Sequence, residues 1–388
     1  MGEVFLAKQI LPRGYERPII VKRILPHLSD DEKFVEMFLQ EAHTASRFQH
    51  ENIAQIYQVG VDAAQYFIAM EYVQGKDVRA LLQRAAEREV SVPHEVAGCI
   101  MLQVCRGLHY AHNKSAPDGT RLNLVHRDVS PQNILLSYEG NVRLIDFGIT
   151  KGASAAGQTR PGTIKGKIPY MSPEQARGEA LDHRSDIFSA GVVLFELLSG
   201  GPLFTGESDF AILEQVRDFS VQRLREKRPV AALHPRLQQT LESCLQTSRC
   251  DRYPSVLRVA EDLDLFLREK DFRDGSSALA LLMNRLFAQE MARENEELTQ
   301  TRAGLPPGAD SSRAGVQVKG GLPARPGRAA PDSGDKRILK HKLVILLLAL
   351  IILFEAFMFI WRDYEWRKRN RSLGLPVRVR HPPADSFP

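Results

Sequence analysis

The chain has few cysteines, few tryptophans and no apolar leader, and each scarcity excludes a class of protein. Its 4 cysteines among 388 residues form no C-x-x-C pair and lie near no histidine ligand pattern, which excludes a disulfide framework and the common zinc sites. Reduced, buried thiols are the interpretation that remains. The N-terminal residues lack the apolar core of a signal peptide. Because no basic stretch is interleaved with aromatic residues, we expect no nucleic-acid partner.

What is present is the composition of a globular protein with a mildly basic balance. Apolar residues make up 43% of the chain, and the net charge is +5 at pH 7. A length of 388 residues is enough for two lobes and a tail. Composition therefore leaves the function open, and the motifs have to decide it.

The stretch from 125 to 148 concentrates polar groups around a predicted hairpin. Two short β-type runs, I-L-L and V-R-L-I, are separated by the turn Y-E-G-N. Asp128 and Asn133 stand just before the first run, and Asp146 stands just after the second. The hairpin would therefore bring two acids and an amide to one end of one ribbon. Hard oxygen ligands at this density suit Mg²⁺.

The letters around these residues, H-R-D-x-x-x-x-N followed by D-F-G, resemble the catalytic core of protein kinases. A lone D-F-G would be a weak signal, but both motifs in this order and spacing are specific. The resemblance implies a bilobal α+β fold with a small β-rich N-lobe, a large helical C-lobe, and ATP and Mg²⁺ as cofactors. It assigns Asp128 to the proton of the substrate hydroxyl, and Asn133 and Asp146 to Mg²⁺. It makes His126 a packed structural residue, and Arg127 is typical of kinases whose activation segment is ordered by phosphate.

The first strands of the chain supply the predicted phosphate site. The β-branched run P-I-I-V-K-R-I matches V-A-I-K, so the resemblance assigns Lys22 to the α- and β-phosphates. A helix opened by a capping box at 29–32 would carry Glu41 on its apolar face. A carboxylate there needs a cation, which the resemblance identifies as Lys22; a solvated glutamate is the alternative. Gly2 and Val4 match the last glycine and the valine of the glycine-rich loop.

The first two glycines of that loop, and the strand that should precede them, are absent. Either the start codon is assigned at an internal methionine, or the protein is impaired at its ATP lid. We favour the first interpretation because the downstream motifs are intact. The second leads to the alternative function, a catalytically impaired kinase-like membrane scaffold.

The resemblance also assigns the adenine site. Met70 would guard the back pocket, and the backbones of Glu71 and Val73 would hold the adenine edge. Leu135 would form the floor of the same site. Residues 113–123 are polar and rich in turn formers, which predicts a surface loop.

Two positions depart from the usual serine/threonine kinase pattern. Ser130 stands where lysine usually follows the catalytic aspartate, and Lys167 stands where threonine usually precedes the S-P-E motif. In the family these side chains meet beside the catalytic acid, so we interpret the pair as an exchange. Lys167 would supply an ammonium for the γ-phosphate, and Ser130 a hydroxyl bridge to Asp128. The alternative is a loss at Ser130 and a surface charge at Lys167. Thr163 is the predicted activation-segment phosphorylation site.

The last kinase motifs belong to the helical lobe. Glu174 in S-P-E-Q is expected to form a buried ion pair with Arg252 in D-R-Y-P-S. Asp186 opens an apolar helix and would cap the backbone of the catalytic loop. The resemblance covers residues 1–273, which we predict to be the kinase domain.

Beyond that domain the character of the sequence changes. Residues 275–299 carry an apolar helical stripe, which would dock on its own lobe or pair with a second copy in a homodimer. Residues 300–335 are rich in Gly, Pro, Ala and Arg without periodicity, which predicts a disordered linker. Residues 343–361 form an apolar run that, at about 1.5 Å per residue, matches the thickness of a bilayer core. We therefore predict a transmembrane helix there and a short tail at 362–388.

Together these features resemble the membrane-anchored bacterial serine/threonine kinases of eukaryotic (Hanks) type. The resemblance implies transfer of the ATP γ-phosphoryl group to hydroxyls of protein substrates, including the activation segment itself, in signal transduction at the membrane. Because the kinase needs ATP, we expect a single pass through the plasma (inner) membrane with the kinase domain in the cytoplasm. Small-molecule substrates and tyrosine specificity are disfavoured.

Overall fold

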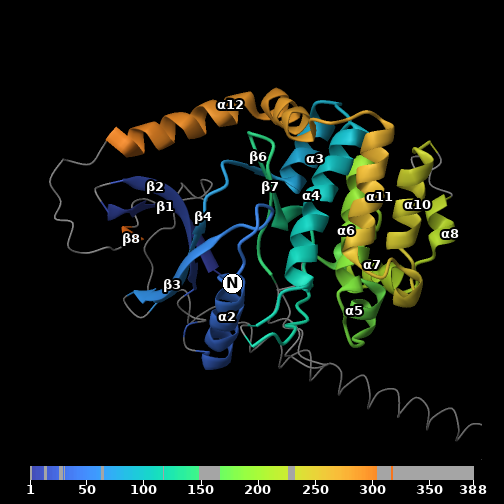
Figure 1. The fold of residues 1–388 in the computed structure, drawn as a ribbon, viewed down its shortest axis with the longest axis horizontal. Coiled ribbons are helices and arrows are strands. Elements are labelled where there is room, and N and C mark those ends of the chain that lie inside the picture. The colour runs from blue at the N-terminus through green and yellow to red at the C-terminus, as the bar shows by residue number, and fades with distance from the viewer. Residues whose placement is uncertain are drawn as a thin grey trace, which may run out of the picture. The chain divides into compact units, whose positions relative to one another are not determined.

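The computed structural model contains a small β-rich lobe and a large helical lobe, joined by a short connection (Figure 1). Both lobes belong to one unit, residues 1–322. The residues that the structure describes are 2–12, 15–25, 29, 31–62, 65–116, 118–147, 167–225, 232–303 and 316–317.

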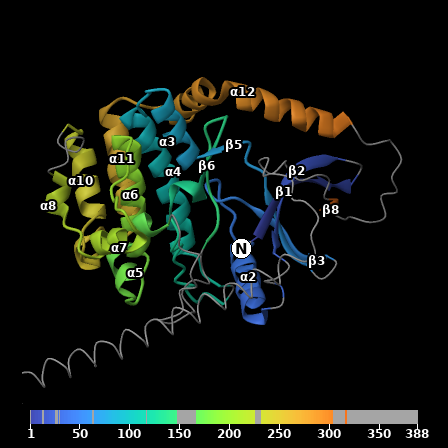
Figure 2. The ribbon, with the colours of Figure 1, turned by 180° about the vertical axis from the view of Figure 1, so that it is seen from behind.

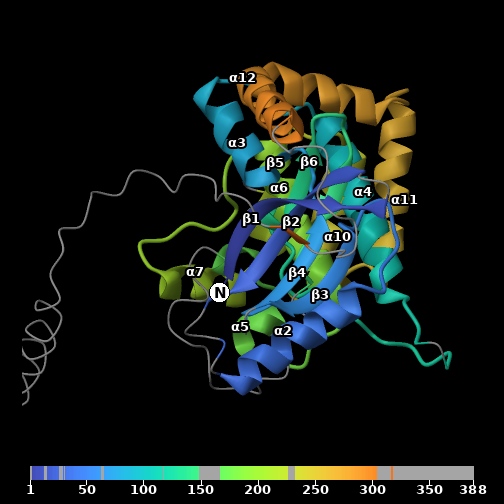
Figure 3. The same cartoon turned by 90° about the vertical axis from the view of Figure 1, so that its left-hand side faces the viewer.

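The small lobe is an antiparallel sheet with the helix α2 against it (Figure 3). Its strands lie in the order β3-β4-β2-β1-β8. The elements are β1 (Gly2–Ile10), β2 (Glu16–Ile24), α2 (Glu32–Ala45), β3 (Ile56–Asp62), β4 (Gln65–Glu71) and the short edge strand β8 (Val316–Gln317).

Alternation along the strands explains how this sheet is buried. Ile19 and Val21 of β2 point to one face and pack with Phe67 and Ala69 of β4. The other face is covered by α2, whose Ala42 packs on β4. Lys22 has the opposite parity to Val21 and therefore belongs to the face of the sheet that α2 covers.

The helix α2 begins differently from the sequence expectation. The predicted capping box at 29–32 is not what starts it, because Asp31 is the N-cap and its Oδ1 accepts a hydrogen bond of 3.2 Å from the Phe34 amide. Aspartate caps helices as well as serine does. Which residue of the stretch 29–32 becomes the N-cap therefore depends on the backbone conformation, which the sequence alone does not determine.

The large lobe is built around two central helices, α4 and α6, and carries a small sheet with strand order β5-β6-β7 (Figures 1 and 2). Its strands and longer helices are β5 (Gly75–Asp77), α3 (Val78–Glu87), α4 (His94–His112), β6 (Ile134–Ser137), β7 (Val142–Leu144), α6 (Arg184–Ser199), α7 (Asp209–Arg217), α10 (Pro235–Cys244), α11 (Val256–Glu269) and α12 (Gly275–Ala303). The remaining pieces are η2 (Pro131–Asn133), η4 (Ile168–Tyr170), α5 (Pro173–Arg177), α8 (Val221–Arg225) and η5 (Arg249–Asp251).

The predicted catalytic hairpin is confirmed. Strands β6 and β7 pair antiparallel with Ile134 opposite Leu144. Four side chains of this ribbon are completely buried and fix it in the core of the large lobe: Ile134, Leu136, Val142 and Leu144. The end of the hairpin that carries the polar residues is therefore held rigidly by apolar packing.

The helix α12 settles one open alternative of the sequence analysis. Leu279, Met283 and Leu286 of its apolar stripe are fully buried in the core of the large lobe, so the stripe packs on its own domain and is not available to a second copy. The helix continues to Ala303 and is broken at Phe287, which has non-helical angles.

The C-terminal predictions fall largely outside the described residues. The predicted span at 343–361 and the tail at 362–388 lie there, as does the linker apart from the last turn of α12 and the residues of β8. Among the helices that the structure describes, none is both long enough and apolar enough to cross a membrane.

Candidate active site

The acid at the start of the hairpin is held by two neighbours. The amide nitrogen of Asn133 donates to the backbone oxygen of Asp128 at 2.8 Å and to its Oδ2 at 3.0 Å. The Lys167 ammonium forms an ion pair with the same carboxylate oxygen. The structure thus brings together three of the predicted catalytic residues, which come from the catalytic loop and from the far end of the activation segment.

The small lobe contributes a lysine to the same region. Lys22 Nζ lies 2.9 Å from Asp146 Oδ2, across 124 residues of sequence. Val4 on β1 stands directly opposite Lys22 in the sheet, so this strand pair carries both predicted phosphate-site residues. Gly2 pairs with Ile24 at the end of the same ladder. The predicted phosphate-binding cation and metal-binding anion are therefore adjacent.

The predicted partner of Lys22 is a glutamate of α2. Glu41 belongs to α2, but its side chain lies outside the part of the chain that the structure describes. The same holds for Thr163 and for the rest of 148–166. Arg127, which would meet a phosphate on that segment, has a buried Nε without a hydrogen-bond partner among the described residues.

The catalytic loop is fixed by a buried carboxylate. Asp186 at the start of α6 accepts hydrogen bonds of 2.8 Å from the backbone amides of His126 and Arg127, as predicted. Its Oδ2 also lies 2.7 Å from His112 Nε2. Burial raises the pKa of Asp186, but the hydrogen bond and charge of His112 outweigh it, and the pKa of this carboxyl is lowered. The loop backbone is thereby held at Arg127, which has a left-handed φ of 63°.

His126 is packed in the interior of the large lobe, as expected. It is completely buried, and its Nε2 lies 3.1 Å from the Ile145 carbonyl oxygen. Its ring packs on Phe147, with the centroids 4.3 Å apart. Burial lowers the pKa of His126, which favours the neutral imidazole.

Two supporting residues were missed by the sequence analysis. His112 at the end of α4 joins Asp186, and Gln175 donates to the backbone oxygen of Arg127 at 3.1 Å. Both act across long sequence separations. A helix-terminal histidine gives no signal that would separate it from a surface residue, whereas the letters S-P-E-Q could have placed Gln175 in a capping box.

The expected exchange between Ser130 and Lys167 is seen only in part. Lys167 reaches Asp128, as the hypothesis required. The hydroxyl bridge from Ser130 is wrong for this structure, because the Ser130 Oγ is buried and has no hydrogen-bond partner among the described residues. Its backbone is extended, and the acceptor Oδ2 of Asp128 already receives Asn133 and Lys167.

The predicted adenine residues line the connection between the lobes. Met70 at the end of β4 is buried, and Leu135 on β6 is half-buried. The amide of Glu71 donates to the Gln55 carbonyl at 2.8 Å, so Glu71 would offer its carbonyl oxygen to an adenine edge. Val73 follows in the connection and would offer its amide.

The oxygen donors at the site fit a hard cation such as Mg²⁺. Because the amide nitrogen of Asn133 donates to Asp128, its amide oxygen is directed away from that residue. Asp146 supplies a carboxylate at the same end of the ribbon, where the Ile145 amide donates to the Asn133 carbonyl at 3.0 Å. Among the described residues no three His, Cys, Asp or Glu side chains gather to bind a metal, so an ion held here would depend on Asn133, Asp146 and substrate phosphates.

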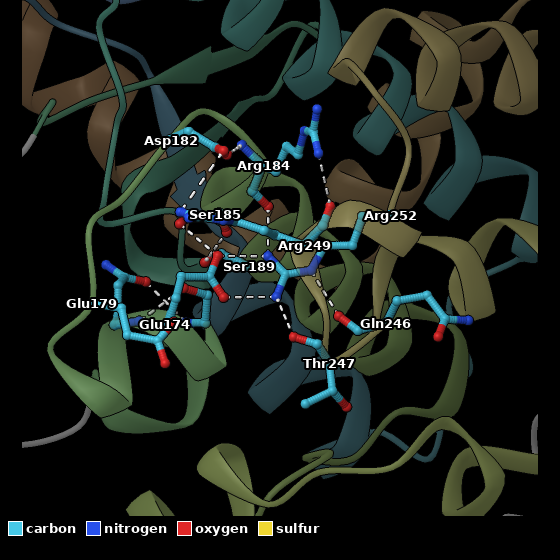
Figure 4. A network of polar contacts seen from close by, with 12 residues as sticks. Glu174, Glu179, Asp182, Arg184, Ser185, Ser189, Gln246, Thr247, Arg249 and Arg252 are labelled. Carbon is cyan, nitrogen blue, oxygen red and sulfur yellow. Dashed lines mark hydrogen bonds and ion pairs between the residues drawn. The ribbon is translucent and has the colours of Figure 1, made fainter.

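A second buried ion pair fixes the base of the activation segment (Figure 4). Arg252 binds Glu174 with both nitrogens, at 2.6 and 2.7 Å, and the two side chains are 0% and 3% exposed. The predicted pair is thus present. Ser185 donates to the same carboxylate at 2.7 Å, and Arg252 also donates to the carbonyls of Gln246 and Thr247. Nearly every polar atom of the pair is therefore satisfied inside the lobe.

Comparison with known proteins gives one consistent family. A family model described as "Protein kinase domain" matches residues 1–262. Of the solved structures, the kinase domain of Mycobacterium tuberculosis PknI is similar, with a TM-score of 0.50 and 27% identity over 68% of this chain and 91% of that one.

Curated relatives are bacterial protein kinases. The chain is 38% identical over 339 residues to the tyrosine-protein kinase MasK of Myxococcus xanthus, covering 85% of this chain and 52% of that one. It is 34% identical over 254 residues to the serine/threonine-protein kinase PknL of Mycobacterium tuberculosis, covering 66% and 60%. It is 31% identical over 301 residues to the serine/threonine-protein kinase PrkC of Bacillus subtilis, covering 77% and 42%. The chain spans about half the length of the curated relatives it matches.

We expect the Glu174→Gln variant to lose about 3–5 kcal/mol of stability, because it leaves the Arg252 charge buried without its counter-ion. Burial acts to raise the pKa of Glu174, but Arg252 lowers it overall. A lowered folded-state pKa means that the pair stabilises the fold fully above the unfolded pKa and progressively less as the pH falls below it. Thermal unfolding at neutral and at acid pH measures the loss of stability. The difference in the free energy of unfolding between variant and wild type should be smaller at acid pH.

The exposed pair between Arg258 and Glu261 on α11 provides the control. A Glu261→Gln change there should alter stability by less than about 0.5 kcal/mol. Equal effects of the two substitutions would contradict a special role for the buried pair.

Proposed function

The chain belongs to the protein kinase family, among the bacterial kinases of eukaryotic (Hanks) type, and we propose that it is a serine/threonine kinase that phosphorylates proteins. The observation that carries the proposal is the meeting of Asp128 with Asn133 and Lys167, beside the pair of Lys22 and Asp146. Members of the family use ATP and Mg²⁺. Relatives named serine/threonine kinases support serine and threonine as the phosphorylated residues, whereas one relative is named a tyrosine kinase.

The residues divide the reaction between them. Lys22 would bind the α- and β-phosphates, and Asp128 would orient the substrate hydroxyl and take its proton. Asn133 and Asp146 would hold Mg²⁺, which when bound neutralises charge on the β- and γ-phosphates. The catalytic loop that carries Asp128 is held by Asp186, so the acid keeps its position during the transfer.

Lys167 would supply a positive charge beside the catalytic acid. Its ammonium contacts the Asp128 carboxylate, so it lies where charge moves as the γ-phosphoryl group is transferred. Ser130 would contribute less, since its hydroxyl makes no hydrogen bond to any described residue. We therefore retain the half of the exchange hypothesis that concerns the lysine.

We also propose that residues 343–361 cross the inner membrane once and leave the kinase domain in the cytoplasm. The support is the apolar run itself, long enough for a bilayer core and interrupted by a single charge, Glu355. A cytoplasmic kinase domain follows from the need for ATP. Signal transduction from the membrane and phosphorylation of the activation segment at Thr163 belong to the same proposal.

The first test is transfer of ³²P from ATP-Mg to casein and to the full-length chain itself, followed by phosphoamino-acid analysis. We expect phosphoserine and phosphothreonine, and a loss of rate of about 10²–10⁴-fold in the Asp128→Asn variant. Phosphotyrosine as the product would overturn the proposed serine/threonine specificity. Equal incorporation by wild type and Asp128→Asn would favour the catalytically impaired scaffold.

The second test concerns the lysine at the catalytic acid. Lys167→Met should lower kcat by about 10²–10³-fold, because it removes a charge next to the transferred group. Ser130→Ala should change kcat less than about threefold, since no hydrogen bond is lost. A Ser130→Lys, Lys167→Thr double variant more active than Lys167→Met would show that the ammonium can serve from either position. Wild-type rates in Lys167→Met would refute its role.

The third test addresses the membrane. After expression in a bacterium, the full chain should remain in the pellet after alkaline carbonate extraction. Leu350→Arg with Leu353→Arg adds about 2.5–3.5 kcal/mol per arginine near the centre of the run and should release the protein. Substituting both leucines with isoleucine is the matched control. Release of the wild-type chain by carbonate would disprove the span.

A further inference from the structure

The C-terminal half of α12 lies against the connection between the two lobes, which we call the hinge and define as residues 72–74. Asn295 Oδ1 accepts a hydrogen bond of 2.7 Å from Gln74 Nε2 in the hinge. Figures 1 and 2 show this half of α12 leaving α3 and running toward the side of β1 and β2. The C-terminal half of α12, which follows the kinase motifs in sequence, therefore contacts the part of the site that would bind adenine.

Glu294 is the centre of this attachment. Its carboxylate forms an ion pair with Lys76 of β5, just beyond the hinge. It also accepts a hydrogen bond of 3.2 Å from the Tyr138 hydroxyl. On the hinge itself, burial and the charge of Glu294 raise the pKa of Tyr72 to about 12. One carboxylate thus joins β5 to the turn of the catalytic hairpin, beside the hinge.

The bend in α12 is what brings Glu294 to the hinge. The helix is interrupted at Phe287, where carbonyl groups lose their helical partners. Arg84 of α3 donates to the Leu286 carbonyl at 3.2 Å, and Arg88 donates to the Arg285 carbonyl at 2.9 Å. Arg84 also pairs with Glu290 at 2.6 Å. The bend is therefore held in place by two arginines and redirects the second half of the helix across the hinge.

The large-lobe end of the hinge has little freedom of its own. A Cβ atom on Gly75 would lie 1.9 Å from the Leu136 carbonyl oxygen, so the backbones of β5 and β6 are in closest approach there. The Tyr138 amide donates to the Gln74 carbonyl at 3.0 Å. With β5 fixed to β6 in this way, a side chain that holds Lys76 and Tyr138 together limits how the adjoining hinge residues can be oriented.

We propose that Glu294 is a positioning residue for ATP, which orients the hinge so that the Glu71 carbonyl and the Val73 amide face the adenine edge. The inference rests on the proposed kinase function, since it deepens the description of the same site. Glu294 touches no substrate, and it acts through Lys76 and through Tyr138, whose amide donates to the Gln74 carbonyl of the hinge. Any partner that displaced the second half of α12 would weaken the affinity for ATP without touching the catalytic loop.

The experiment compares Glu294→Gln with Glu296→Gln in the full-length chain. Both remove one negative charge from the same helix, but Glu296 is exposed and, among the described residues, forms no hydrogen bond or ion pair with the hinge. We expect the KM for ATP and the Kd for ATP by calorimetry to rise about fivefold in Glu294→Gln, the effect of losing one charge-assisted hydrogen bond, with kcat changed less than twofold. Glu296→Gln should match the wild type.

Hydrogen exchange supplies a readout that does not need activity. The amides of residues 72–76 should exchange faster in Glu294→Gln, whereas those of α4 and α6 should not change. Equal Kd and equal exchange in the two variants would overturn the inference. A wild-type chain that neither binds ATP nor transfers phosphate would instead refute the proposed function, while the exchange data would still report on the hinge.

A double-mutant cycle identifies the path of the effect. If Glu294 acts through Lys76, the Lys76→Met, Glu294→Gln double variant should bind ATP no more weakly than Glu294→Gln alone. Additive losses from the two substitutions would show that Glu294 reaches the site by another route and would contradict the assignment. Thermal unfolding of all variants distinguishes a local change at the hinge from general destabilisation.

Discussion

The catalytic arrangement depends on one buried carboxylate, Asp186. It holds two successive backbone amides of the catalytic loop and the ring of His112, and it is itself fixed near the start of α6, a helix buried over most of its length. The loop adopts a left-handed conformation at Arg127 that an L-residue enters at a cost, and the hydrogen bonds to Asp186 offset that cost. This anchor fixes the backbone just before Asp128, and Asn133 then holds Asp128 to the start of the hairpin.

From this anchor the site is assembled by elements that are far apart in sequence. The hairpin places Asn133 and Asp146 at one end of a buried ribbon, and β2 brings Lys22 from the other lobe. The activation segment contributes Lys167 from its far end, close to the Glu174 pair that fixes its base. Each charged group is therefore held by a part of the fold that is rigid for another reason, which is the condition for electrostatic preorganisation.

The sequence predicted most of what lies inside motifs and little of what lies between them. The hairpin, the lysine strand and the buried pair of Glu174 with Arg252 follow from motifs whose residues have fixed partners. The unpartnered hydroxyl of Ser130 could not be predicted, because it depends on which donors occupy the Asp128 carboxylate in the folded structure, and these are Asn133 and Lys167. The pair of Lys76 with Glu294 joins residues 218 positions apart, and two surface-type side chains give no local pattern by which to find each other.

The packing of α12 also determines where this domain can be cut. The family match ends at residue 262, yet Leu279, Met283 and Leu286 on α12 are completely buried in the large lobe. A recombinant fragment ending at that match would uncover the apolar surface that these side chains fill, at about 1.5–3 kcal/mol for each of them. Such a fragment would be prone to aggregation, and its failure in a screen would say nothing about catalysis. The unit suited to crystallisation and inhibitor work extends through Ala303.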